Sequence, residues 1–447
     1  MIKIYDTMTR SLRDFVPLTE NVVNMYVCGP TVYNYIHIGN ARSAVAFDTI
    51  RRYFEYCGYT VNYISNFTDV DDKIIKAANE AGISTKELSD KFIAAFMEDT
   101  AQLGIKPATQ NPRVINYMDE IIAFVSTLVD KGFAYVSEGD VYFRVAKSNN
   151  YAKLANKTLE DLEIGASGRT DSETDRKENP LDFALWKAAK EGEVSWDSPW
   201  GPGRPGWHIE CSVMATEILG DTIDIHGGGA DLEFPHHTNE IAQSEAKTGK
   251  IFANYWMHNG FVNVDNEKMS KSLGNFVTVH DMLKTVDGQV LRFFLATQQY
   301  RKPINFTEKA IHDAEVNLKY LKNTHSLPLT DQVNQDELQT YLDAFQVAMD
   351  DDFNTANGVT VLFDMAKWIN SGNYDQTVKD AFEKMLQVFG IVFEEEVLDE
   401  DIEKLIEERQ AARANKDFAT ADRIRDELAA QGIKLLDTKE GVRWTRD

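Results

Sequence analysis

The sequence has few cysteines: Cys28, Cys57 and Cys211 are the only three among 447 residues. An odd number without regular spacing is not the framework of a disulfide-stapled secreted domain. It indicates a reducing compartment such as the cytoplasm, in which a cysteine serves as a core residue, a metal ligand or a nucleophile. We expect Cys57, in Tyr-Cys-Gly, to be a core residue at the end of a helix.

Long hydrophobic runs are also missing. The longest apolar stretch, near residues 121–129, is much shorter than the roughly 20 residues that a membrane-spanning helix needs. The first 20 residues include Asp6 and Asp14 and lack the apolar core of a signal peptide. The sequence therefore predicts a cytoplasmic protein with no membrane partner.

Positive charge is scarce, since 47 Lys and Arg stand against 71 Asp and Glu and give a net charge of −24. Such a balance excludes a protein coated in nucleic acid but leaves room for local recognition of RNA. The end of the chain differs, because residues 402–447 hold equal numbers of basic and acidic side chains. Trp444, among arginines, is suited to stack on a nucleotide base. The alternative is that Trp444 closes a small hydrophobic core.

Two nucleotide-binding motifs are absent or unconvincing. No G-x-x-x-x-G-K-[ST] occurs, which excludes a P-loop ATPase. Residues 201–206 formally match G-x-G-x-x-G, but no strand precedes them and no helix opens within them. Pro202 and Pro205 also remove backbone N–H groups that would hold a phosphate. A dinucleotide-binding loop is therefore not predicted here.

What the chain does have is an alternation of short apolar runs and amphipathic stretches. Residues 25–27 and 61–64 are predicted strands, and residues 41–56 and 73–103 are predicted helices. This spacing indicates an α/β fold with a parallel, Rossmann-like sheet, in which ligands bind at the carboxyl ends of the strands. Cys28 and the polar residues after position 65 follow two such ends.

The length of the chain predicts several domains. A polar insertion interrupts the sheet pattern, helices dominate after residue 305, an acidic run follows, and the chain closes with two helices and a small hairpin. The expected divisions are 1–110 and 206–305 for the two halves of the catalytic nucleotide-binding domain, 111–205 for the insertion, 306–393 for an α-helical bundle, 394–403 for an acidic linker, and 404–447 for a small mixed α/β domain.

Two short segments carry the chemistry. His37-Ile38-Gly39-Asn40 opens a predicted helix, where free N–H groups and the helix dipole favour a phosphate. Lys268-Met-Ser-Lys-Ser272 offers two lysines among serines on a loop, suited to clamp a triphosphate while charge shifts in the transition state. Taken singly, each segment has a simpler interpretation. His37 could merely cap the helix, and the lysines and serines of the loop could occur together by chance. Together, on either side of an interrupted parallel sheet, they indicate an ATP site.

These segments resemble the two signatures of class I aminoacyl-tRNA synthetases. Further motifs resemble cysteinyl-tRNA synthetases: residues 28–33 (CGPTVY), 182–187 (DFALWK), 206–211 (GWHIEC) and 234–240 (FPHHTNE). The resemblance covers essentially the whole chain. Asn40 stands where the class signature most often has histidine, a replacement that cysteinyl members commonly tolerate.

The resemblance implies one zinc ion held by Cys28, Cys211, His236 and Glu240. Thiolate, imidazole and carboxylate are zinc donors, although ligands this scattered are not recognisable by spacing alone. His236 and Glu240 lie four residues apart, on one face of a predicted helix. The neighbouring His237 would point elsewhere.

The resemblance further implies that the protein activates L-cysteine with ATP and Mg²⁺ to cysteinyl-adenylate and transfers cysteine to the 3′ end of cysteine tRNA. Zinc would select the substrate thiol over the hydroxyl of serine, because sulfur is the better ligand. We expect His37, Asn40, Lys268 and Lys271 to be catalytic. The predicted ATP-binding residues are His37, Gly39, Asn40, Gly229, Lys268, Ser270 and Lys271. The predicted cysteine-binding residues are Gly29, Thr31, Asn66, Thr68, Trp207 and Asp231.

By the same resemblance, residues 306–393 would bind tRNA, residues 404–447 would bind the anticodon, and the protein would be a monomer. Two alternatives are a ligase that joins cysteine to an amino sugar and a zinc-structured RNA-binding regulator. The first would need neither the helical nor the terminal domain, and the second would show degraded phosphate-binding motifs.

Overall fold

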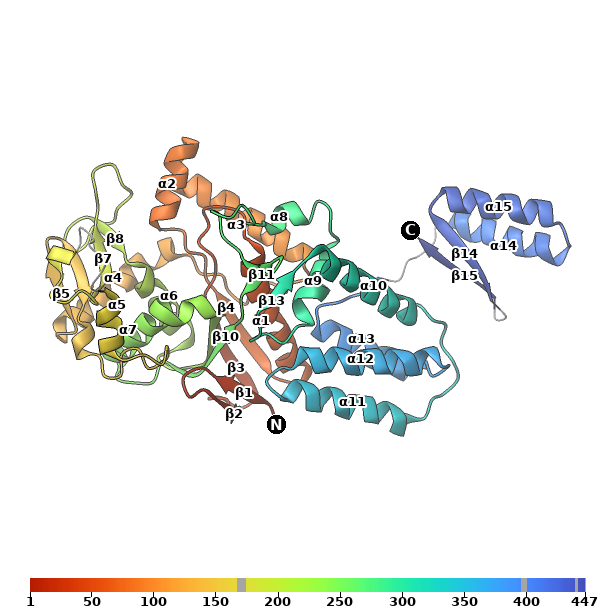
Figure 1. Ribbon diagram of the computed structural model, residues 1–447, viewed down its shortest axis with the longest axis horizontal. Helices are drawn as coiled ribbons and strands as arrows, with labels where there is room; N and C mark the ends of the chain where they lie inside the picture. The colour runs from red at the N-terminus through yellow and green to blue at the C-terminus, as the bar shows by residue number, and fades with distance from the viewer. Residues whose placement is uncertain (167–173, 395–399, 439–440, 447) are drawn as a thin grey trace. The chain divides into compact units, whose positions relative to one another are not determined.

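The computed structural model describes residues 1–166, 174–394, 400–438 and 441–446. The chain forms two compact units, Met1–Val392 and Phe393–Asp447, each described by itself (Figure 1). No helix in the described part of the chain has both the length and the apolar character needed to cross a membrane.

A four-stranded, entirely parallel sheet forms the centre of the first unit. Its order is β10 (Ala253–Asn259), β9 (Ile223–Gly229), β3 (Val22–Val27) and β4 (Thr60–Ser65). The two strands that follow the insertion, β9 and β10, join the two that precede it through the pairing of β9 with β3, so the α/β fold predicted from the sequence is confirmed. The carboxyl ends of β3, β9 and β10 lie together, which is where a parallel sheet binds ligands.

Successive residues of these strands face opposite sides of the sheet. Gly227 of β9 lies against α1 (Ile38–Tyr56), since a Cβ built there would come within 2.4 Å of the Phe47 ring. Its neighbour His226 points the other way, toward the side on which α6 (Trp207–Leu219) and α7 (Thr238–Thr248) pack. The two faces therefore belong to different layers of helices.

Helix α1 begins at Ile38, three residues before the predicted start. The His37 imidazole accepts a hydrogen bond from the Asn40 N–H, and the Asn40 side-chain oxygen accepts one from the His37 N–H. This reciprocal cap satisfies N–H groups that would otherwise lack a partner at the helix start. The predicted stretch 73–103 is two helices, α2 (Asp72–Ala81) and α3 (Thr85–Gln102), separated by the left-handed Gly82.

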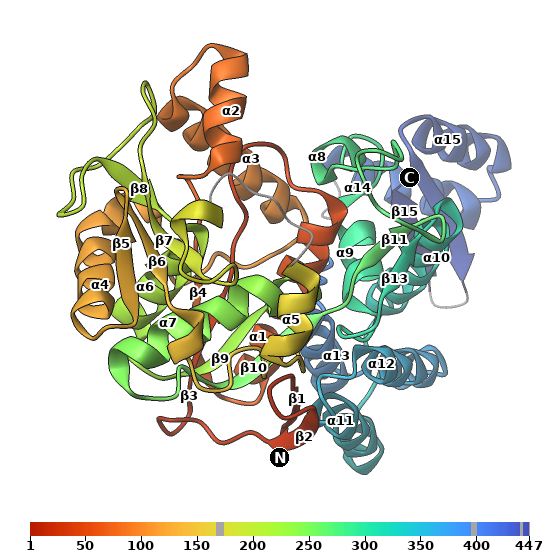
Figure 2. The same cartoon turned by 60° about the vertical axis from the view of Figure 1, so that its left-hand side comes forward.

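The insertion folds as an antiparallel sheet beside α4 (Met118–Asp130), which a short 3-10 turn precedes (Figure 2). Residues 167–173 of the expected polar loop lie outside the described residues. The sheet order is β5 (Ala134–Ser137), β6 (Asp140–Phe143), β7 (Phe183–Ala188) and β8 (Gly203–Pro205). Strand β8 ends at Pro205, and Gly206 follows as the cap of α6. The insertion therefore leads directly into Trp207, the first residue of that helix.

A smaller sheet carries the lysine-bearing loop. Strand β11 (Val262–Val264) pairs with β12 (Glu267–Lys268) and with β13 (Ile304–Phe306). At the start of the chain, β1 (Lys3–Asp6) and β2 (Ser11–Asp14) form a hairpin that packs on β10.

Four helices follow the sheet domain and form the predicted bundle. They are α10 (Glu308–His325), α11 (Gln335–Asp350), α12 (Thr355–Asn370) and α13 (Gln376–Val388) (Figure 1).

The buried Arg292, on α9 (Gly288–Ala296), ties the bundle to the sheet domain. Its guanidinium lies 2.7 Å from the Asp48 carboxylate and donates to the Phe389 carbonyl at 2.8 Å. Two carbonyls at the end of α13 thus have charged donors, because Arg52 also donates to the Gln387 carbonyl at 3.1 Å.

The second unit contains α14 (Glu400–Ala414), α15 (Phe418–Ala430), β14 (Ile433–Thr438) and β15 (Gly441–Arg446). Ile402, Ile424, Leu428 and Ile433 form its small core, and Trp444 is partly buried against them. Trp444 therefore packs on this small hydrophobic core, as the alternative interpretation of this residue predicted. Residues 395–399 of the expected linker lie outside the described residues, and α14 begins at Glu400.

Candidate active site and metal cluster

A cavity of about 690 Å³ opens at the carboxyl ends of the parallel strands. All seven predicted ATP-binding residues line it, and so do Cys28 and four of the predicted cysteine-binding residues, namely Gly29, Thr31, Trp207 and Asp231. Segments from both halves of the domain meet there, although they lie more than 200 residues apart in the sequence. The structure thus brings the predicted residues to one place.

Asn66 and Thr68 are buried behind the cavity wall. Asn66 Oδ1 accepts from the Gly29 N–H at 3.0 Å, and its amide donates to Thr68 Oγ1 at 3.2 Å. A Cβ at Gly29 would come within 1.7 Å of the Asn66 carbonyl oxygen, so only glycine fits between the two segments. These residues shape the wall beside Cys28.

His37 is a hydrogen-bond acceptor at the start of α1. Its Nδ1 accepts from the Asn40 N–H at 3.2 Å. Burial lowers the pKa of His37, and Lys271 and Lys73 lower it further, while Asp231 opposes them. The imidazole is therefore neutral near pH 7, which agrees with its acceptor role. Gly39 leaves the ring uncovered, because a Cβ there would lie 2.9 Å from it.

The two signature segments are joined through their backbones. The Ile38 N–H donates to the Val277 carbonyl at 3.1 Å, and the Val279 N–H donates to the Ile36 carbonyl at 2.9 Å. This antiparallel bridge lies just beyond the lysine-bearing loop, so the end of that loop is tied to the start of α1.

The two lysines of the loop carry no ion pair to any carboxylate that the structure describes. Lys271 Nζ lies 5.4 Å from the ring centres of both Tyr33 and Phe276, and Lys268 Nζ lies 6.0 Å from the Phe261 ring. Aromatic faces hold a cation weakly without neutralising it. Both ammonium groups therefore remain available to an anion in the cavity.

Trp207 is 41% exposed, unusually much for a tryptophan, and its ring stacks on the His236 imidazole at 4.3 Å between centroids. Asp231 lies close against Gly229, where a Cβ would come within 2.4 Å of its Oδ1. An indole face and a carboxylate thus flank the opening beside Cys28, as the walls of an amino-acid pocket would.

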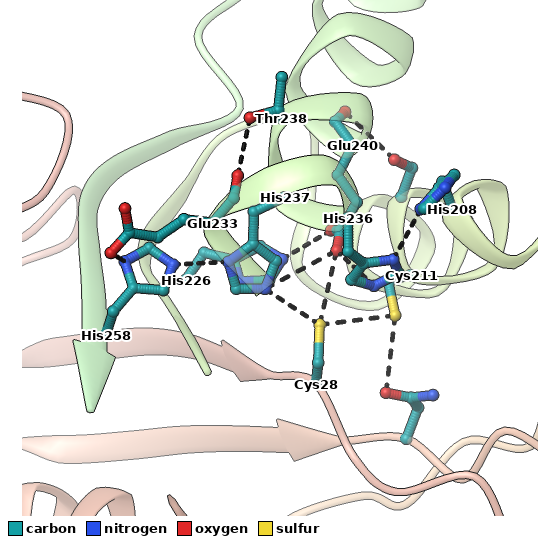
Figure 3. A network of polar contacts seen from close by, with 12 residues as sticks. Cys28, His208, Cys211, His226, Glu233, His236, His237, Thr238, Glu240 and His258 are labelled. Carbon is teal, nitrogen blue, oxygen red and sulfur yellow. Dashed lines mark hydrogen bonds and ion pairs between the residues drawn. The ribbon is translucent and has the colours of Figure 1, made fainter. Parts of the chain in front are cut away.

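Cys28, Cys211, His236 and Glu240 form a buried cluster in which every ligand atom lies within 4.8 Å of the others (Figure 3). The two sulfur atoms are 3.7 Å apart, and Cys28 Sγ lies 3.5 Å from Glu240 Oε1. Two thiolates bound about 2.3 Å from a tetrahedral zinc ion would be about 3.8 Å apart, whereas a disulfide needs about 2.0 Å. The donor set and its spacing fit a zinc ion.

The charges of the cluster also favour a cation. Burial opposes ionisation of Glu240, but His226 and His236 together lower its pKa to about 2. A hydrogen bond from Cys28 lowers the pKa of Cys211 to about 6, whereas burial raises the pKa of Cys28. A buried carboxylate and a readily ionised thiol lie side by side, an arrangement that a metal ion stabilises.

Four further histidines surround the cluster, and the sequence analysis assigned none of them to it. His208 Nδ1 lies 3.0 Å from His236 Nδ1. His226 Nε2 lies 2.6 Å from Glu240 Oε2, His237 Nε2 lies 3.4 Å from Cys28 Sγ, and His258 Nε2 lies 2.7 Å from His237 Nδ1. His226 and His237 also complete a second possible ligand group with Cys28 and Glu240. His226 and His258 are on neighbouring parallel strands, so their shared face was a signal that could have found them.

The expectation that His237 points elsewhere is wrong. Helix α7 begins only at Thr238, and the turn over Glu233–His237 that precedes it is kinked, because the backbone of Phe234 is extended (φ −142°, ψ 131°). The spacing of a regular helix therefore does not apply to His236 and His237, and both face the cluster. Cys57 also differs from expectation, since it ends α1 but is exposed.

Comparisons with known proteins agree with this site. A family model described as "tRNA synthetases class I (C) catalytic domain" matches residues 14–316, a "DALR domain" matches 344–394, and a "Cysteinyl-tRNA ligase anticodon binding domain" matches 395–444. Methionyl-tRNA synthetase from Mycobacterium tuberculosis, solved with methionyl-adenylate, has a TM-score of 0.60 over 82% of this chain and 89% of its own, at 15% identity, which shows the fold alone. The fold and the matched domains define a class I aminoacyl-tRNA synthetase.

The particular family follows from full-length relatives. The chain is 95% identical to a cysteine–tRNA ligase of Streptococcus thermophilus (strain CNRZ 1066) and 82% identical to one of Streptococcus agalactiae serotype V, in each case over 100% of both chains. The chain therefore belongs to the cysteine–tRNA ligase family.

Proposed function

We propose that the cavity binds ATP and L-cysteine side by side, and that Cys28, Cys211, His236 and Glu240 hold one zinc ion that selects the substrate by its thiol. The observation that carries this proposal is the 3.7 Å separation of the Cys28 and Cys211 sulfur atoms beside the cavity. Bound zinc would supply a soft Lewis acid that ligates the cysteine sulfur and ligates a serine hydroxyl poorly.

Four side chains act in the first step, the formation of cysteinyl-adenylate from ATP and cysteine. His37 and Asn40, at the start of α1, contact the phosphates of ATP, where the helix dipole favours negative charge. Lys268 and Lys271 close over the departing pyrophosphate, and Mg²⁺ accompanies the nucleotide. The uncompensated charge of the lysines supports these roles, because charge builds up on the phosphates in the transition state.

The other predicted residues complete the pocket. Gly39, Gly229 and Ser270 contact ATP. Gly29 and Thr31 bound the cysteine side of the cavity, with Asn66 and Thr68 supporting them from behind. Asp231 pairs with the cysteine ammonium, and Trp207 closes over its side chain.

The remainder of the chain binds tRNA. Residues 306–393 contact the body of cysteine tRNA, and residues 404–447 contact its anticodon, with Trp444 as a stacking surface. The matched anticodon-binding domain supports this division. We place the enzyme in the cytoplasm, in keeping with three free cysteines. We also expect it to be a monomer.

Two assays test the proposal. ATP–pyrophosphate exchange is expected to require cysteine and to ignore serine, and equal exchange with both would rule out selection by zinc. Charging of cysteine tRNA separates this function from a ligase that transfers cysteine to an amino sugar, since only the tRNA-dependent enzyme forms cysteinyl-tRNA.

A further inference from the structure

A chain of hydrogen bonds leads from the Cys28 sulfur to the N-terminal hairpin. Cys28 Sγ lies 3.4 Å from His237 Nε2, His237 Nδ1 lies 2.7 Å from His258 Nε2, and His258 Nδ1 lies 2.7 Å from Thr7 Oγ1. Figure 3 shows the His237 and His258 rings next to each other, to the left of the Cys28 and Cys211 sulfur atoms, with His258 on β10. Four residues from four segments of the chain thus form one continuous path.

Three of the four residues on this path are shielded from water, and the fourth, Cys28, is partly exposed to the cavity. Thr7 and His258 are each 6% exposed, and His237 is fully buried. Both imidazoles are neutral, because each is buried and the nearest carboxylate oxygens, Glu240 Oε1 and Glu233 Oε1, lie beyond hydrogen-bond distance at 4.0 and 3.9 Å. A neutral imidazole carries one proton on one of its two nitrogens, and the partner of the other nitrogen decides which.

The direction of the path follows from its Cys28 end. A metal-bound thiolate only accepts hydrogen bonds, so His237 must carry its proton on Nε2 and accept on Nδ1. His258 must then carry its proton on Nε2 and accept on Nδ1. The group that donates to His258 Nδ1 is the Thr7 hydroxyl, because the Glu233 carboxylate has no proton to give and lies 3.9 Å away.

We propose that Thr7 is a positioning residue for the metal cluster: its hydroxyl fixes the proton positions of His258 and His237 so that an N–H always faces the Cys28 thiolate. This inference rests on the proposed zinc site. The N–H offsets part of the thiolate charge in a buried place and orients Cys28 as a ligand.

The position of Thr7 is itself well fixed. The Thr7 N–H donates to the Trp256 carbonyl at 2.9 Å, which attaches the turn after β1 to β10, two residues before His258. The hairpin therefore supplies a hydroxyl at one point and does not simply cover the sheet.

A pair of variants tests the proposal in the full-length protein. Thr7→Val keeps the shape but removes the hydroxyl, whereas Thr7→Ser keeps it. We expect Thr7→Val to raise the zinc dissociation constant about tenfold, the lower end of the 10- to 100-fold effects seen when a partner of a metal ligand is lost. Thr7→Ser should stay within about twofold of the original protein. Competition with a zinc chelator measures both constants.

Cobalt substitution gives a second measurement. The sulfur-to-cobalt charge-transfer band should shift in Thr7→Val and not in Thr7→Ser, because the hydrogen bond to Cys28 changes. A Thr7→Val protein with unchanged zinc affinity and an unchanged band would overturn the relay while leaving the zinc site intact. An unsubstituted protein that takes up no zinc would overturn the proposed function, and the relay with it.

If Thr7→Val does not fold, the positions of the ring protons in the unsubstituted protein test the proposal. In the ¹⁵N-histidine-labelled zinc-bound protein, long-range ¹H–¹⁵N correlations distinguish a protonated ring nitrogen from a bare one. Protons on Nε2 of both His237 and His258 support the relay. A proton on Nδ1 of either histidine overturns it.

Discussion

His37 and Thr278 pair in an antiparallel bridge, although one precedes α1 and the other follows the lysine-bearing loop. Close by, Tyr35 stacks on His280 at 4.1 Å between ring centres, and the His280 imidazole lies 3.2 Å from Asp99 of α3. The two signature segments thus share one backbone junction. The loop is anchored at that junction, and within it the Ser270 N–H donates to Asn275 Oδ1 at 2.8 Å.

Replacing Lys271 by methionine should slow ATP–pyrophosphate exchange about 100-fold with little change in the cysteine KM. A lysine that acts only when charge develops on the phosphates lowers kcat rather than binding. Steady-state exchange kinetics at varied ATP and cysteine provide the measurement. Lys284→Met is the matched control, because Lys284 is an exposed lysine paired with Asp281. Equal losses in both variants would contradict a specific role for Lys271.

Replacing Cys211 by serine should remove zinc and weaken cysteine binding together. A hydroxyl is a poor zinc ligand, and three remaining donors hold the ion less tightly. Elemental analysis of the purified protein and the cysteine KM are the two readouts. Cys57→Ser, at an exposed cysteine outside the cluster, should leave both unchanged. Full zinc content in Cys211→Ser would exclude Cys211 from the site.

Replacing Asp48 by asparagine should lower the thermal midpoint strongly, since it leaves Arg292 buried without its carboxylate. Breaking a buried pair costs roughly 3–5 kcal/mol. Asp313→Asn is the control, because Asp313 pairs with Lys309 on an exposed helix face and such pairs contribute little.

The effect of Asp48 should also depend on pH. Burial opposes its ionisation, but Arg292 and Arg52 lower the pKa of Asp48 below the usual 3.8. A lowered carboxyl pKa stabilises the fold fully above the unfolded value, and this stability is lost as pH falls through the folded one. The gap in thermal midpoint between the original protein and Asp48→Asn should therefore be constant near neutrality and shrink below about pH 4. A gap that grows with acid would contradict the assignment.

Replacing Trp444 by alanine should impair charging of tRNA while leaving cysteine-dependent ATP–pyrophosphate exchange unchanged. Loss of one stacked base contact costs about 1–3 kcal/mol, or roughly 5- to 150-fold in kcat/KM for tRNA. Trp444→Phe, which keeps an aromatic face, should retain most of the activity. Circular dichroism of both variants checks the small core that the ring also contacts. Normal charging by Trp444→Ala would assign the ring to that core alone.

The sequence predicted the parallel sheet because period and spacing identify strands and crossover helices locally. It also predicted which strand ends carry chemistry, since carboxyl ends meet at one edge. The apolar pattern placed the start of α1 at residue 41, three residues late, although a capping histidine at position 37 had been considered. The first turn carries small and polar residues, so the hydrophobic period alone does not mark it.

The histidines around the metal cluster could not be assigned to it from the sequence, for a different reason. His226 and His258 are recognisable only once β9 and β10 are known to be neighbours, and His237 only once the kinked turn before α7 is known. The Asp48–Arg292 pair was equally hidden, since it joins residues on two helices that pack only in the folded chain.

Helix α1 has a mechanical consequence. His37 caps this helix, and Asn40 lies in its first turn. Asp48 lies about two turns further on and pairs with Arg292 and Arg52. Both arginines donate hydrogen bonds to carbonyls at the end of α13. Gly39 and Asp48 are separated by about 13 Å of rigid helix at 1.5 Å per residue. A tilt of α1 by roughly 5° about the α13 contact would move the ATP end by about 1 Å, a displacement that can cost about 100-fold in rate. A strain on the proposed tRNA-binding bundle that tilted α1 by this amount would therefore change the reaction rate at the proposed ATP site.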